Sequence, residues 1–167
     1  MRRAVTAFAV LLTAVLLQVD VANRLRLPAG RPDLVLLCVV ALALAAGPTA
    51  GAVIGFVAGF AVDILPPADH TIGRLALAYA VVGYAAGLLE DVEERSVPTT
   101  MFVVALTSGL AVLVYAGVGA LLGDPRIYAR SVAHSLFATV IYDVFLAPFV
   151  VPLVSGVARR AEPVGAY

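Results

Sequence analysis

The stretch between Leu34 and Val62 carries no charged residue, and this constrains the fold more than any other feature of the chain. It is too long for one simple membrane span, because the hydrocarbon core of a bilayer takes about 20 helical residues. Gly47 and Pro48 interrupt it with a residue suited to end a helix and one suited to begin the next. The stretch therefore predicts a tight helical hairpin. Its first arm, residues 34–46, rises only about 20 Å, so a re-entrant arm is the main alternative to a full crossing.

The composition is that of an integral membrane protein. Hydrophobic residues make up 62% of the chain and charged residues only 13%, and the mean hydropathy is +1.03. The formal net charge is zero and every basic residue is an arginine, so we expect no nucleic-acid partner. Cys38 is the only cysteine, which excludes an internal disulfide and a cysteine-based metal site.

Charges and turn residues divide the chain into about six transmembrane helices, which we expect to form one all-α bundle. This single polytopic domain spans residues 1–167. The expected helices are 4–22, 34–46, 48–65, 74–89, 98–122 and 131–157. An even number of crossings places both termini on one side. The arginines split almost evenly between the two sides, and those at the chain ends favour cytoplasmic termini only weakly.

Glycines recur every four residues in the third expected helix, and an aspartate continues the same step. This spacing places a smooth ridge on one helix face, and in lipid such ridges allow close contact between helix backbones. The fourth expected helix has a second small-residue face with two tyrosines beside it. The candidates for helix packing or partner binding are Gly51, Gly55, Gly59, Asp63, Tyr79, Gly83, Tyr84 and Gly87. We expect these glycine faces to pack the bundle closely and to leave a lateral groove for a partner's transmembrane helix.

A polar stripe follows four-residue steps along the sixth expected helix, through Ser131, Ser135, Thr139 and Asp143, with His134 beside it. Asp143 is expected near the middle of the membrane, where a charged side chain costs about 2.5 to 3.5 kcal/mol. It therefore needs a partner, a proton or water. Two interpretations stay open: a binding or proton-relay position that faces the interior of the bundle, or a carboxyl group that holds two helices together. The intramembrane polar candidates are His134, Thr139 and Asp143.

The sequence contains no Walker loop, no HExxH, no GxSxG and no pair of histidines at metal-ligand spacing. We therefore expect no enzymatic activity, no catalytic residue, no metal and no cofactor. An intramembrane enzyme would need catalytic groups that meet at one depth, and only the region of His134 and Asp143 offers such a pair.

The segments RPDLVLL, GAVIGFVAGFAVDIL and LALAYAVVGYAAGLL follow one another in an order that resembles the MreD family of bacterial rod shape-determining membrane proteins. The similarity covers about residues 31–90. It places the family's motif on Pro32, Asp33, Gly51, Gly55, Gly59, Asp63, Gly73, Tyr79, Gly83, Tyr84 and Gly87.

The resemblance implies a non-enzymatic scaffold subunit of the elongation (rod) complex, which supports cell-shape control and peptidoglycan synthesis in the bacterial cytoplasmic membrane. The implied partners are membrane lipids and the single-span protein MreC, and through it MreB, RodA and a class B penicillin-binding protein. A homo-oligomer is a further option. The implied topology is multi-pass with cytoplasmic termini, and the implied fold is similar to the substrate-binding subunits of ECF transporters. The alternative function is therefore a small-molecule-binding subunit of an ECF-type vitamin transporter.

Overall fold

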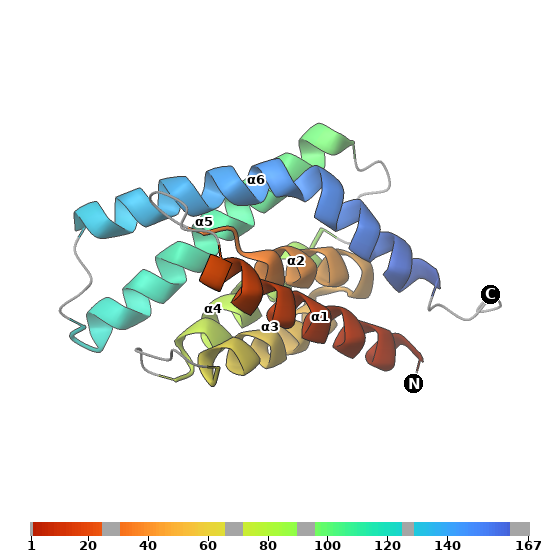
Figure 1. Ribbon diagram of the computed structural model, residues 1–167, viewed down its shortest axis with the longest axis horizontal. Coiled ribbons are helices and arrows are strands. Elements are labelled where there is room, and N and C mark those ends of the chain that lie inside the picture. The colour runs from red at the N-terminus through yellow and green to blue at the C-terminus, as the bar shows by residue number, and fades with distance from the viewer. Residues whose placement is uncertain (1, 25–30, 66–71, 90–95, 125–128, 161–167) are drawn as a thin grey trace.

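The computed structural model describes residues 2–24, 31–65, 72–89, 96–124 and 129–160, and this part of the chain forms helices and turns without strands. This confirms an all-α fold. The helices are α1 (Arg2–Arg24), α2 (Leu34–Ala46), α3 (Pro48–Asp63), α4 (Arg74–Gly87), α5 (Val97–Leu121) and α6 (Ala129–Arg160). Figure 1 shows them gathered into one bundle, with α2 in its interior.

Helix α2 is the centre of the bundle. Every residue from Val35 to Leu44 is buried, and α2 contacts each of the other five helices. A helix that is apolar on all sides is stable only when it is covered all round, and here the cover is protein. Along Val35–Leu44 the short first arm of the hairpin therefore contacts neighbouring helices instead of lipid.

The hairpin between α2 and α3 turns at Gly47. Its φ of 83° lies in the left-handed region, which glycine adopts without a steric penalty. The Gly47 amide donates to the carbonyl of Ala43 at 3.0 Å and so ends α2. Pro48 begins α3, where its fixed φ is suitable and its missing N–H is not needed.

Helices α5 and α6 are the longest elements. By length and composition, the segments Val97–Leu121 and Val132–Ala158 could each cross a membrane, whereas the apolar parts of α1, α2, α3 and α4 are shorter. Pro148 and Pro152 lie inside α6, and Figure 1 shows this helix changing direction along its length. Large apolar side chains on α5 and α6 point outward, including Leu106, Phe145 and Phe149. An apolar outer surface of this kind faces lipid.

Several helix ends differ from the expected ones. Helix α3 stops at Asp63 instead of residue 65, and α4 stops at Gly87 instead of residue 89. Helices α1 and α6 run beyond their apolar segments to include arginines, as Arg2–Arg24 and Ala129–Arg160. The expectation stopped these two helices short of the neighbouring arginines, but a long charged side chain at the end of a helix is compatible with helical backbone.

Candidate functional site

Helices α3 and α4 pack backbone against backbone through their glycines. A Cβ atom added at Gly55 would lie 2.0 Å from the carbonyl oxygen of Tyr79, and one added at Gly59 would lie 2.3 Å from that of Leu75. Gly51 and Gly83 face each other in the same way, since a Cβ at Gly83 would lie 2.0 Å from the Gly51 carbonyl oxygen. A real Cβ never approaches backbone so closely, so each of these positions requires glycine.

The contact extends to the hairpin, because a Cβ at Gly87 would lie 2.5 Å from the carbonyl carbon of Gly47. The expected close packing of the glycine faces of α3 and α4 is confirmed, and because each face is covered by the other helix, these glycines are not open to a partner. The lateral groove expected beside them stays a prediction. Tyr84 lies away from this contact and is half exposed, with 50% of its surface accessible. Tyr79, on the inner side of α4, is buried.

Asp63 connects the end of α3 to the start of α4. Its carboxylate is fully buried and accepts hydrogen bonds from the backbone amides of Gly73 at 2.8 Å, Ala76 at 3.2 Å and Leu75 at 3.4 Å. The first amides of a helix have no partner within the helix, and a carboxylate there also interacts favourably with the helix dipole. Gly73 has a φ of 99°, so the left-handed turn that starts α4 favours glycine. Asp63 therefore caps α4 from outside that helix.

A buried arginine holds the same end of α4 against α5. Arg74 is only 2% exposed, and its Nη1 lies 2.7 Å from Oδ2 of Asp124, just beyond the end of α5. Its Nη2 donates to the Tyr115 carbonyl at 3.2 Å, and the guanidinium carbon lies 4.1 Å from the centre of the Tyr115 ring. A guanidinium group can combine a carboxylate partner with an aromatic face in this way. This ion pair fixes where α4 meets α5.

The first residues of α2 lie inside the bundle, where α6 supplies a carboxylate. The backbone amide of Asp33 donates to Oδ1 of Asp143 at 2.7 Å, and the Asp33 side chain accepts from the Leu36 amide at 3.0 Å. Asp33 is thus the N-cap of α2. Two carboxyl groups from distant parts of the chain therefore meet at the positive end of the α2 dipole.

Three further helices contribute side chains to this cluster. From α4, the Tyr79 hydroxyl donates to Oδ2 of Asp33. From α5, the Ser108 hydroxyl donates to Oδ2 of Asp143 at 2.8 Å. From α1, Gln18 donates to the Pro32 carbonyl at 3.0 Å and accepts from the Leu34 amide at 2.9 Å. We name this cluster the α2 collar, and it consists of Gln18, Asp33, Tyr79, Ser108 and Asp143.

The chemistry of the α2 collar is that of a helix cap built from several helices. Inside a bundle that lies in lipid, no bulk water is available for the free amides at the start of a helix. The collar gives those amides carboxylate and amide oxygens as acceptors, and it gives Asp143 two donors. Among the described residues, no group of three or more His, Cys, Asp or Glu side chains could hold a metal ion.

The polar stripe expected along α6 does not act as one group. Asp143 is fully buried in the α2 collar, Thr139 is partly buried and His134 is exposed. The side chains of Ser131 and Ser135 lie outside the described residues. The pairing of His134 with Asp143 that an intramembrane enzyme would need is therefore wrong.

Sequence reasoning missed the roles of Gln18, Asp33 and Ser108, and the ion pair of Arg74 with Asp124. A signal existed for Asp33, because an aspartate directly before an apolar helix is a frequent N-cap. The other partners lie on helices far apart in the sequence, and no local pattern connects them.

The apolar outer surface, the long apolar helices and the buried charges held within helix contacts define a helical membrane protein. The model of one protein family, described as rod shape-determining protein MreD, matches residues 1–160 of the 167. This chain belongs to the MreD family, which confirms the resemblance drawn from its sequence. No curated protein and no solved structure matched the chain in the corresponding comparisons.

Proposed function

We propose that this chain is a non-enzymatic scaffold subunit of the rod complex in the bacterial cytoplasmic membrane. Membership of the MreD family gives it a role in rod shape determination. In this proposal it binds the single-span protein MreC and, through it, connects MreB to peptidoglycan synthesis by RodA and a class B penicillin-binding protein.

The observation that carries the proposal is that the buried carboxyl groups of Asp63 and Asp143 accept hydrogen bonds from groups on other helices or at their ends. Asp143 accepts from the Asp33 amide and from Ser108, and Asp63 accepts from three amides at the start of α4. Such groups position helices, whereas a catalytic or transport site needs groups that can reach a substrate. The pocket described below is lined by none of these residues. Buried polar chemistry in this chain thus supports a rigid bundle.

A scaffold also needs an outer surface for its partner. Since α3 and α4 cover each other's glycines, we place the partner's transmembrane helix on outward apolar side chains instead. Phe56 and Phe60 on α3 are exposed, and their rings stack with centres 6.2 Å apart. In lipid, a partner helix gains contact energy by packing against such a surface.

The proposed topology is multi-pass with both termini in the cytoplasm. Ala4 near the start of α1 and Ala158 near the end of α6 line the same pocket, which supports termini on one side of the bundle. Homo-oligomerisation and a fold similar to ECF substrate-binding subunits stay predictions. No observation favours the vitamin-transporter alternative, since His134 is exposed whereas Asp143 is fully buried.

Site-specific photo-crosslinking in native membranes tests the scaffold. A photoreactive residue is placed at one outward position on each of four helices: Phe56, Tyr84, Leu113 or Phe149. The buried position Val39 on α2 is the control. We expect a protein adduct of an MreC-like single-span partner from one outward face and none from Val39. Adducts to an ATPase pair with a shared coupling subunit, or no protein adduct from any outward position, would contradict the scaffold.

A further inference from the structure

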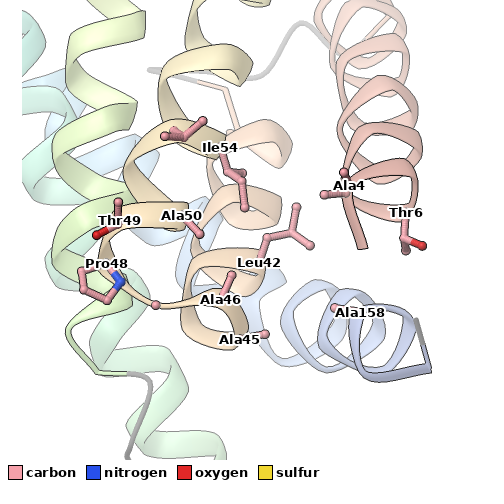
Figure 2. Close-up of a pocket in the computed structure, with 13 residues that line it drawn as sticks. Ala4, Thr6, Leu42, Ala45, Ala46, Pro48, Thr49, Ala50, Ile54 and Ala158 are labelled. Atoms are coloured by element: carbon pink, nitrogen blue, oxygen red, sulfur yellow. The ribbon is translucent and has the colours of Figure 1, made fainter. Parts of the chain in front are cut away.

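An open pocket of 660 Å³ lies where α1 begins, α2 ends, α3 begins and α6 ends. Figure 2 shows Leu42 and Ile54 beside the space between the α2–α3 hairpin and α1, with Ala158 of α6 nearby. Among the described residues that line it, only Thr6 and Thr49 have polar side chains and none is acidic. Many of the lining side chains are the short methyl groups of alanines, and Ala46 is itself exposed. An apolar pocket that opens at the surface of a membrane protein accepts an apolar chain.

The short extent of the pocket along the helix axes favours a lipid chain as its occupant over a helix of another protein. On α3 the lining runs from Pro48 to Ile54, which is about 9 Å along the helix axis, and on α1 it spans one turn. A partner's transmembrane helix packs along much of a hydrocarbon core about 30 Å thick. An acyl chain is thin and flexible, so it can fill a short pocket of this kind.

Charge at the same end indicates which lipid fits. Arginines occupy positions 2 and 3 at the start of α1 and positions 159 and 160 at the end of α6, within two residues in the sequence of the lining residues Ala4 and Ala158. The Arg160 side chain is exposed. Arginines near a membrane surface attract anionic headgroups, and basic pockets between helices bind anionic lipids.

We propose that this pocket binds an acyl chain of one anionic phospholipid, with the lipid phosphate beside Arg160 and the neighbouring arginine positions. The proposal rests on the pocket and on the arginine positions close to it in the sequence, and it is independent of the scaffold function.

Native mass spectrometry of the full chain in detergent tests this proposal, with dioleoyl-phosphatidylglycerol and dioleoyl-phosphatidylcholine as probes. We expect one phosphatidylglycerol bound per chain, with at least about tenfold preference over phosphatidylcholine, because an anionic headgroup is favoured at the arginine-rich end of the bundle. Equal retention of the two lipids would overturn the proposal.

Two variants separate the acyl-chain site from the headgroup site. Ala46→Phe fills the pocket and is expected to weaken phosphatidylglycerol binding at least about tenfold. Its control is Ala120→Phe, the same change at an exposed alanine of α5 outside the pocket. Arg160→Gln is expected to weaken phosphatidylglycerol binding about fivefold and to leave phosphatidylcholine binding unchanged. Its control is Arg31→Gln, at another exposed arginine.

Binding by Ala46→Phe equal to that of Ala120→Phe would overturn the acyl-chain site. An Arg160→Gln effect no larger than that of Arg31→Gln would overturn the headgroup site. A photoreactive residue at position 46 checks the occupant in native membranes. A lipid adduct supports the proposal, and a protein adduct without a lipid adduct contradicts it.

Discussion

The contact between α3 and α4 is made by glycines against backbone, whereas the start of α2 is held by side-chain hydrogen bonds from α1, α4 and α6, with Ser108 of α5 bonded to Asp143 of α6. Both regions fix helices inside the same bundle. The first depends on missing side chains, so its stability should respond to added volume. The second depends on particular oxygen atoms, so its stability should respond to lost hydrogen-bonding capacity.

The difference follows from where the helices begin. The first amides of α4 reach Asp63 at the end of α3, and α3 and α4 then need only shape to pack along their length. The first amides of α2 lie among α1, α4, α5 and α6, so those helices must supply the acceptors or the groups that orient them. Close packing and a buried helix start are thus two separate requirements, met by different residue types.

The largest effect is expected at the glycine contact. Gly55→Ala should lower the free energy of unfolding by about 3 kcal/mol, because the new Cβ would lie 2.0 Å from the Tyr79 carbonyl oxygen and backbone must move. Denaturant unfolding of the purified protein in detergent measures this change in the free energy of unfolding. The control is Gly117→Ala on α5, where an added Cβ meets nothing within 4 Å. Equal stability of the two variants would break the distinction between the regions.

A smaller loss of unfolding free energy is expected when the α2 collar is changed. Asp143→Ala leaves the Asp33 amide and the Ser108 hydroxyl without their acceptor, and it should cost about 2.5 kcal/mol. Asp143→Asn keeps one acceptor oxygen at nearly the same volume and should cost about 1 kcal/mol. The same unfolding measurement compares them. If the two variants were equally unstable, volume and not hydrogen bonding would govern the collar.

Removal of the ion pair at the start of α4 should lower the free energy of unfolding by an intermediate amount. Arg74→Gln removes the bond to Asp124 and should cost about 1.5 kcal/mol, a value held down because Asp124 is 24% exposed. Combining it with Asp124→Asn gives a double-mutant cycle, in which we expect a coupling of about 1 kcal/mol. Additive effects would show that the pair contributes nothing specific.

The loss of unfolding free energy expected for a single hydroxyl of the collar is as small as that expected for Asp143→Asn. Tyr79→Phe keeps the buried ring and removes the bond to Asp33, and it should cost about 1 kcal/mol. Tyr84→Phe makes the same change on the half-exposed side of α4 and should stay within about 0.5 kcal/mol of the parent. Thermal unfolding in one detergent compares the two. A loss at Tyr84 as large as at Tyr79 would argue against the collar.

Much of the architecture could be predicted from local patterns. Gly47 and Pro48 mark the hairpin, and the four-residue glycine steps mark the packing face of α3. Both signals are short-range, because turn geometry and helix periodicity act within a few residues. The glycine face of α4 was also visible in the sequence, but the contact of the two faces depends on how separate segments pack, which the pattern of one helix does not give.

The α2 collar could not be predicted from the sequence. Asp33 and Asp143 are far apart in the chain, and their meeting depends on how α6 is placed against α2. The separation of His134 from Asp143, in contrast, was predictable. Nine helical steps of about 100° leave the two residues about 180° apart, so one is buried while the other is exposed.

The central claim is that buried carboxyl groups position helices and do not carry out chemistry or proton transfer. Its most direct test replaces the chromosomal copy with Asp143→Asn and measures cell shape together with the amount of folded protein in the membrane, with His134→Ala as the control. We predict that rod shape follows the amount of folded protein and is retained in both variants. Round cells that contain normal amounts of folded Asp143→Asn protein would contradict this account.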